Sequence, residues 1–248
     1  TTLSPYLLLS APVFTTLLLL LSAACALAFT LGYKTRWTTP LLWLAVYSLQ
    51  ERNPWILIGG DAWVRATLFW LIFLPVNEYF SWDRTQSHRG PNRTTVANAA
   101  SVGLILQVVY IYVWSGIAKY GEGYQEGNTI YRVLSGPEFG QERAQWLLYF
   151  PELIKRVSQI IPYLEVLAGL LLIVPFLSSA CRRLGVASLI LMHLGIWYSM
   201  DLYHFSAIAV GTLLMLWLPD YSEERLAKGY LPKWLSAILL IWCLTILV

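Results

Sequence analysis

Three ionisable side chains lie in or beside long apolar runs, at places where they could hold or pass a proton. Glu165 lies in the middle of one run, three residues after the helix-bending Pro162. Lys119 ends a second run, and His193 lies in the middle of a third. A charge inside hydrocarbon costs roughly 2.5–3.5 kcal/mol on insertion scales, so each group needs a partner or a function. Catalytic proton transfer is one interpretation of all three.

Each residue also has a structural interpretation. Glu165 is a proton carrier, an ion-pair partner of Lys119 or Arg65, or a structural carboxyl that is protonated or hydrogen-bonded between helices. Lys119 is a lysine that extends from the mouth of a span to the interface, or a partly desolvated amine that acts as a base. His193 acts in chemistry or makes a hydrogen bond between helices.

A polar break separates two of the apolar runs. Its members are Glu51, Arg52, Asn53, Asp61 and Arg65. Such a break is tolerated at membrane depth only where it is buried in protein or lines a cavity. The structural interpretation is a tight external turn in which Asp61 caps a helix that begins at Ala62. The two arginines are then expected to pair with the two acids.

The composition indicates a membrane protein. Of 248 residues, 57% are hydrophobic and 12% are charged, whereas a soluble domain has roughly 45–50% apolar and about 25% charged residues. Too little charge remains to cover a soluble globule of this size. The net charge of +3 is too small to indicate nucleic-acid binding. Three separated histidines and three cysteines without a C-x-x-C pair predict no metal site.

The apolar runs predict an all-α fold, a polytopic integral membrane bundle of helices. Because about 20 residues cross a bilayer as a helix, about eight spans are expected, at 8–31, 38–57, 62–80, 95–118, 157–177, 184–200, 204–219 and 233–248. Basic residues gather in alternate loops, which the positive-inside rule assigns to the cytoplasm, so that Lys119 lies at the outer face. The extramembrane segment 119–156 is expected to place residues 141–150 as an amphipathic helix in the interface.

An ordered series of short motifs resembles the HTTM domain, the membrane domain shared with vitamin K-dependent gamma-carboxylases. The series extends over roughly residues 31–219, and the resemblance implies one all-helical membrane domain over residues 1–248. The matching stretches are Leu31–Arg36, Tyr47–Pro54, Gly59–Asp61, Phe73–Pro75, Ser81–Asp83, Leu106–Tyr110, Ser115–Lys119, Leu164–Val166 and Met192–Gly195.

The resemblance implies a chemistry for Lys119. In the carboxylases a lysine at the end of a span deprotonates reduced vitamin K, which then reacts with oxygen to give a strong base that takes a proton from a glutamate side chain. Lys119 lies at the matching position. Ala118 departs from the pattern, because the carboxylases have a second lysine there. Their large luminal domain is expected to have no counterpart here, and the family's usual first span is expected to be missing from this chain.

Two hypotheses follow, and whether the chain is an enzyme stays open between them. The first is carboxylase-like, quinone-linked chemistry at the outer face of a bacterial inner membrane. Lys119 would be the quinol base, Glu165 and His193 proton relays, and the segment 119–156 a lid that faces a peptide substrate. The second is a non-catalytic accessory subunit of an energy-transducing or peptide-maturation membrane complex. A transporter ranks last, because the sequence has no inverted repeat.

Overall fold

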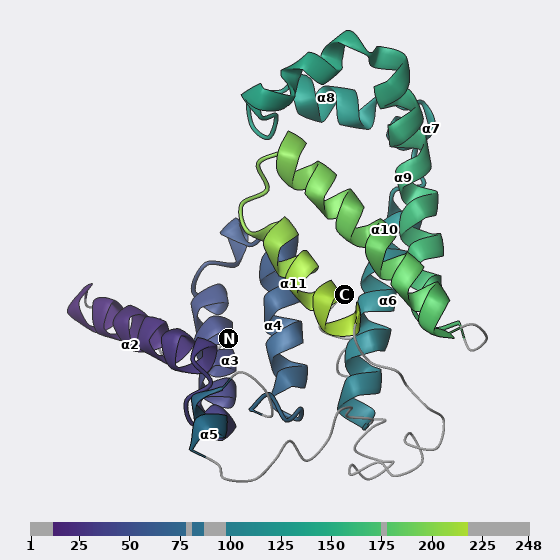
Figure 1. The fold of residues 1–248 in the computed structure, drawn as a ribbon. Coiled ribbons are helices and arrows are strands. Elements are labelled where there is room, and N and C mark those ends of the chain that lie inside the picture. The colour runs from purple at the N-terminus through teal and green to yellow at the C-terminus, as the bar shows by residue number, and fades with distance from the viewer. Residues whose placement is uncertain (1–11, 78–80, 87–97, 175–177, 218–248) are drawn as a thin grey trace. The chain divides into compact units, whose positions relative to one another are not determined.

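The computed structural model describes residues 12–77, 81–86, 98–174 and 178–217. Within these ranges the regular elements are all helices, and no strand occurs (Figure 1). The chain divides into two compact units, and the boundary falls between Gly103 and Leu104. The all-helical class expected from the apolar runs is therefore confirmed for this part of the chain.

Among the described residues, the first unit contains four helices before α6 and a short 3₁₀ turn. They are α2 (Pro12–Thr30), α3 (Thr35–Arg52), η1 (Pro54–Ile56), α4 (Gly59–Leu71) and α5 (Trp82–Thr85). The boundary between the units lies within α6 (Ala99–Ala118). The rest of the second unit is α7 (Glu122–Gln125), α8 (Thr129–Ser135), η2 (Glu142–Tyr149), α9 (Pro151–Leu171), α10 (Ser178–Ser199) and α11 (Phe205–Trp217).

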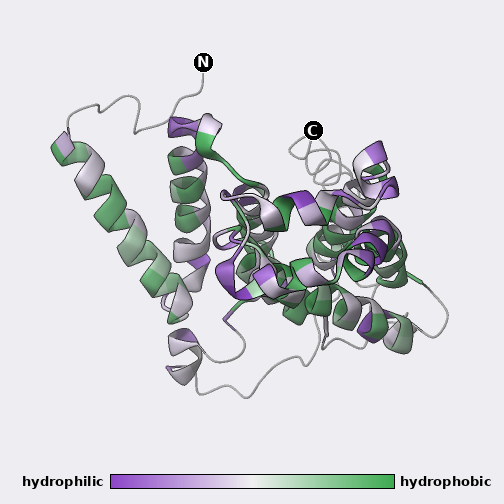
Figure 2. Cartoon of the chain, turned by 90° about the horizontal axis from the view of Figure 1, so that it is seen from above, coloured by the Kyte–Doolittle hydropathy of each residue, from purple (hydrophilic) through white to green (hydrophobic). Residues whose placement is uncertain are grey.

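Three helices among the described residues are long and apolar enough to cross a membrane. They are Pro12–Thr30, Ala99–Ala118 and Ser179–Ser199, and α11 is a shorter apolar helix. Hydrophobic residues predominate along the longer helices (Figure 2). Many of their large side chains are exposed, as Leu21 and Leu191 are. Apolar side chains on the outside of such helices are expected where lipid replaces water as the solvent.

The other expected spans differ from the helices in length and position. α3 ends at Arg52 rather than at residue 57, and α9 begins at Pro151 rather than at residue 157. The early start brings charged residues such as Glu152 and Lys155 into the first turns of α9. The expected span 233–248 lies outside the described residues.

The polar break between α3 and α4 forms a capped turn. Arg65 donates to Glu51 at 3.3 Å, so one of the expected ion pairs is present. α4 begins at Gly59, which corrects the expected start at Ala62. Asp61 therefore lies in the first turn of α4, where its carboxylate accepts the backbone N–H of Ile58 at 2.9 Å. Arg52 ends α3, and Asn53 caps its C-terminus.

Two of the motif stretches meet at the start of α3. The backbone N–H groups of Trp82 and Asp83 donate to the carbonyls of Leu31 and Gly32 at 2.9 and 3.0 Å. Gly32 has a φ of +67°, and a Cβ there would lie 2.3 Å from the Cβ of Ser81. Glycine is therefore needed at this position both for its backbone angle and for the close approach of the second stretch.

The helices of the second unit approach one another closely at glycines. A Cβ at Gly116 of α6 would lie 2.6 Å from the carbonyl oxygen of Pro162 in α9. A Cβ at Gly185 of α10 would lie 2.7 Å from the carbonyl oxygen of Ala168. Small residues allow helix backbones to pack this closely in membrane proteins. α9 is thus held directly against both α6 and α10.

The segment 119–156 folds over the ends of α9 and α10. Its apolar cluster consists of Ile130, Leu134, Ala144 and Ile154. The helix expected at residues 141–150 is present as a 3₁₀ helix, η2, rather than an α-helix. The backbone N–H of Gln141 donates to the carbonyl of Ser199 at 3.1 Å, which ties the start of η2 to the end of α10.

Candidate functional site

Lys119 and Glu165 form a close ion pair in the second unit. The Nζ atom of Lys119 lies 2.7 Å from each carboxylate oxygen of Glu165, and it also donates to the hydroxyl of Ser115. The Glu165 side chain is 6% exposed, and that of Lys119 is 25% exposed. One partner is therefore nearly enclosed by protein, while the other faces an opening.

The local sequence explains how the pair forms. Ser115 and Lys119 are four residues apart at the end of α6, so both lie on the helix side that faces α9. Gly116 lets the backbone of α9 approach that side. Glu165 follows Pro162 by three residues, and Pro162 lacks the N–H that would bond to the carbonyl one turn earlier. The two charges therefore meet beside the close approach of α6 and α9 at Gly116.

The amine and the carboxylate of this pair are in direct hydrogen-bond contact. An amine that donates to both oxygens of a carboxylate balances its charge, and removing either partner would leave a buried charge uncompensated. The short contacts to Glu165 and Ser115 fix the position of the amine. The amine can pass a proton to Glu165 and accept one from a bound hydroxyl. As an ammonium it can also stabilise negative charge on an oxygen.

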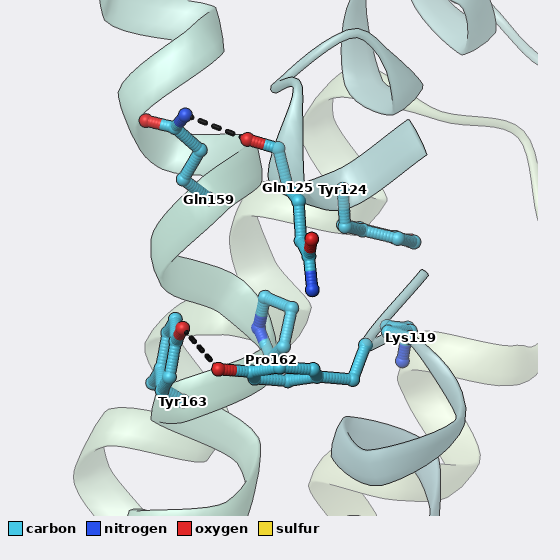
Figure 3. Close-up of a pocket in the computed structure, with 7 residues that line it drawn as sticks. Lys119, Tyr124, Gln125, Gln159, Pro162 and Tyr163 are labelled. Carbon is cyan, nitrogen blue, oxygen red and sulfur yellow. Dashed lines mark hydrogen bonds between the residues drawn. The ribbon is translucent and has the colours of Figure 1, made fainter. Parts of the chain in front are cut away.

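A pocket of about 180 Å³ opens beside Lys119. Its other lining residues are mainly aromatic or amide side chains: Tyr120, Tyr124, Gln125, Gln159, Pro162 and Tyr163. Figure 3 shows the side chain of Gln125 extending from α7 toward the level of Pro162 and Lys119. An apolar cavity of about 150 Å³ holds a benzene molecule. The pocket is therefore of a size to accept one aromatic ring.

Hydrogen bonds hold the pocket walls in place. The Gln159 side chain donates to the backbone carbonyl of Gln125 at 2.8 Å, which joins α9 to α7. The hydroxyls of Tyr120 and Tyr163 are 2.8 Å apart, and their rings meet edge to face. Burial, and then the negative charge of Glu165, raise the pKa of Tyr124. Its phenol therefore stays neutral and can donate a hydrogen bond.

His193 belongs to a separate buried pair. Its Nε2 atom lies 2.8 Å from the hydroxyl of Tyr112, and Phe205 packs against the ring. His193 is 1% exposed and Tyr112 is 2% exposed. The structure thus joins Lys119 to Glu165 and joins His193 to Tyr112. His193 is not among the residues that line the pocket beside Lys119.

Sequence reasoning missed Tyr112 and the aromatic lining of the pocket. Tyr112, Ser115 and Lys119 recur at helical spacing, and this pattern could have identified a polar side of α6. The sequence alone assigns no role to Tyr120, Tyr124 and Tyr163, because tyrosines are common at membrane interfaces. The four-residue helix α7 is too short for a periodic pattern to identify Gln125 as a wall of the site.

Among the described residues, no group of three or more His, Cys, Asp or Glu side chains is arranged to hold a metal ion. No protein-family model, curated protein or solved structure significantly matches the chain.

Proposed function

We propose that this chain is an HTTM-like multi-pass membrane protein of about eight spans, and that its pocket beside Lys119 binds the ring of a quinol. The observation that carries the proposal is the Lys119–Glu165 pair at the wall of a ring-sized pocket. The family resemblance supplies the identity of the ring. The pocket supports it, since three tyrosines and Pro162 offer flat or apolar contacts around a hydroxylated ring.

The residues present suit a quinol ring. Lys119 and Gln125 provide polar groups that can contact ring oxygens, while the Tyr120 and Tyr163 hydroxyls are already bonded to one another. When bound, a quinol would supply reducing equivalents for chemistry with oxygen. The protein's part would be to hold the ring and to accept its proton.

Lys119 and Glu165 act as one proton-accepting unit. In the resting pair the shared proton lies on the amine, so Lys119 alone has no free electron pair. Lys119 passes one proton to a Glu165 oxygen and then takes the proton of the bound hydroxyl. The O–H bond of the ligand breaks, an N–H bond forms again, and Glu165 ends as a neutral acid. The ammonium then faces the oxygen that lost its proton.

His193 has a supporting role in this proposal. Its hydrogen bond to Tyr112 ties α10 to α6, the helix that carries Ser115 and ends just before Lys119. We assign proton transfer at the pocket to Lys119 and Glu165, and positioning to His193 and Tyr112.

Calorimetry can test the proposal by measuring the affinity of quinol binding and the proton exchange that accompanies it. The purified chain in lipid nanodiscs is titrated with 2-methyl-1,4-benzoquinol, a single-ring quinol without a long tail, in buffers of different ionisation enthalpy. We expect binding without net proton exchange with the buffer, because the proton lost by the quinol stays on Glu165, and a loss of about tenfold or more in affinity for Lys119→Ala and Glu165→Gln. Lys155→Ala is the matched control, because Lys155 is an exposed lysine on α9. Equal binding by all four proteins would overturn the proposal.

The second candidate function is an accessory subunit of a larger membrane complex. It is favoured by α2, which is apolar and has no buried residue. Such a helix is expected to contact lipid or a partner protein. Mild-detergent purification from the native membrane distinguishes the two functions. A fixed set of partner proteins that co-purifies equally with the wild-type chain and with Lys119→Ala would favour the accessory-subunit function.

A further inference from the structure

A long apolar groove lies between α9 and α10 and is independent of the Lys119 pocket. Its volume is about 540 Å³, and its walls include Leu134, Trp146, Val157, Ile161 and Met192. The lining extends along α9 from Leu153 to Leu164 and along α10 from Ser188 to Ser199. At 1.5 Å per residue these stretches are about 16 Å long. The groove is therefore long and narrow.

Trp146 and Leu147 of η2 line part of the groove, and η2 is fastened to the end of α10. The Arg143 guanidinium donates to the carbonyls of Trp197 and Tyr198 at 2.6 and 2.9 Å. It also packs 4.7 Å from the centre of the Trp197 ring. The Trp146 indole donates to the Tyr198 hydroxyl at 3.1 Å. These contacts hold η2 in a fixed position against the end of α10, where it forms one wall of the groove.

The edge of the groove is exposed and apolar. Leu153, Ile160 and Leu191 are exposed by 54%, 56% and 71%. Leu191 belongs to Ser179–Ser199, one of the helices able to cross a membrane. Because lipid is expected to cover these side chains, the groove is continuous with the hydrocarbon of the bilayer.

Two hydroxyl groups at the groove already have partners within the protein. The Ser199 hydroxyl donates to the Gly195 carbonyl at 2.7 Å, and the Tyr198 hydroxyl donates to the Arg143 carbonyl at 3.1 Å. The groove therefore offers a ligand apolar contact and little hydrogen bonding. A hydrocarbon chain satisfies these conditions, whereas a peptide would bring backbone groups that need partners.

The groove and the Lys119 pocket lie on nearly opposite sides of α9. The pocket uses Gln159, Pro162 and Tyr163, and the groove uses Val157, Ile161 and Leu164. At 100° per residue the two sets point roughly 160° apart. A quinone whose ring lies beside Lys119 could not place its tail in the groove without passing around α9. The occupant of the groove is therefore a different molecule.

We propose that this groove binds one acyl chain of a bilayer phospholipid. The chain lies along α9 and α10 at the exposed apolar edge, beside the wall formed by α8 and η2. The proposal does not depend on quinol chemistry, since it concerns the other side of α9.

Two glycines allow a matched test. A Cβ at Gly195 meets no atom within 4 Å, and Gly195 lines the groove. Gly211 of α11 is also exposed and equally free of neighbours, but it does not line the groove. Substitution by Ala, Leu and Phe at each position adds graded volume. At Gly195 the added side chain fills the groove, whereas at Gly211 it extends from the exposed surface of α11 and leaves the groove unchanged.

The experiment uses the purified chain in phosphatidylcholine vesicles that contain a palmitoyl chain with a diazirine near its end. After irradiation, labelled peptides are identified by mass spectrometry. We expect adducts concentrated on the groove residues of α9 and α10, and about tenfold less label there in Gly195→Phe, since losing the burial of two methylenes weakens binding about tenfold. Ala and Leu should give intermediate losses, and Gly211→Phe should leave the label unchanged.

Two results would overturn the proposal. One is label spread evenly over all exposed apolar helix faces and unaffected by any Gly195 substitution. The other is displacement of the label by a soluble isoprenoid alcohol at concentrations where a fatty alcohol of equal length has no effect, which would assign the groove to isoprenoid chains instead.

Discussion

The Nζ atom of Lys119 lies 2.7 Å from both carboxylate oxygens of Glu165, although 46 positions separate the two residues in the chain. The pair lies where α6 and α9 meet, and one end of it faces a pocket. A contact of this kind contributes to packing and to chemistry at once. Stability measurements and ligand measurements must therefore be made on the same variants.

Removing one member of the pair should destabilise the protein. Glu165→Leu leaves the Lys119 charge in a partly buried place without its partner, and losing one partner of a buried pair costs about 3–5 kcal/mol. We expect a value near the lower limit, because the Lys119 side chain is 25% exposed. The double variant Lys119→Met/Glu165→Leu should recover most of the loss, since both charges are then gone. Thermal unfolding in detergent measures both effects, and equal stability of the single and double variants would contradict the argument.

Gly116→Ala should separate α6 from α9. The added Cβ would lie 2.6 Å from the Pro162 carbonyl oxygen and 2.7 Å from a Val166 methyl group. Forcing a group into a closely packed contact costs about 1–3 kcal/mol. Gly211→Ala is the control, because a Cβ there meets nothing and should stabilise α11 by about 0.5–1 kcal/mol. The unfolding temperatures should therefore move in opposite directions. If both variants gain stability, the close approach of the two helices is wrong.

Tyr112→Phe should lower stability through its partner His193. The change removes a hydroxyl that lies 2.8 Å from the Nε2 atom of a nearly inaccessible ring. Leaving a buried polar atom without its partner costs about 1–3 kcal/mol. Combining Tyr112→Phe with His193→Phe should cost less than the sum of the single changes. A double-mutant cycle from unfolding curves gives this coupling energy, and a value near zero would mean that the hydrogen bond contributes nothing.

Much of the site could be predicted from the cost of burying charge. Glu165 and Lys119 stand out because each interrupts an apolar run, and this needs no knowledge of the fold. Their pairing could not be assigned to one partner, since Arg65 was an equal candidate for Glu165. The choice is made by Gly116 and Gly169, whose missing side chains set which sides of α6 and α9 meet. No local pattern in the sequence indicates that choice.

Element boundaries were predicted less well, and the reason is physical. The hydropathy of α9 falls at its charged first turns, so the expected span begins at residue 157 although the helix begins at Pro151. Proline at the first helical position followed by Glu152 is itself a start signal. Asp61 was expected to precede its helix, but it lies in the first turn and accepts a backbone N–H there. An acidic side chain fits either position, so the sequence alone does not choose.

Asp83 should make the start of α3 sensitive to acid. Its carboxylate accepts the backbone N–H groups of Lys34 and Thr35 at 2.7 and 2.9 Å, and also the Thr35 hydroxyl. Desolvation raises the pKa of Asp83, but these hydrogen bonds outweigh it, so the pKa is lower than usual. The folded state then binds fewer protons than the unfolded state. The stabilisation is therefore complete above the unfolded-state pKa near 3.9, and it is lost as the pH falls through the lower pKa of the folded state.

The matched comparison for this acid effect is Asp83→Asn, which keeps an oxygen acceptor but removes the charge. At pH 7 the variant should be less stable by about 0.3–1 kcal/mol, the range for a negative charge near a helix N-terminus. Below pH 4 the difference between the two proteins should shrink, because the wild-type carboxyl becomes protonated there. Unfolding followed by circular dichroism from pH 7 to pH 3 measures the difference. A gap that stays constant across this range would show that the charge of Asp83 does not support the start of α3.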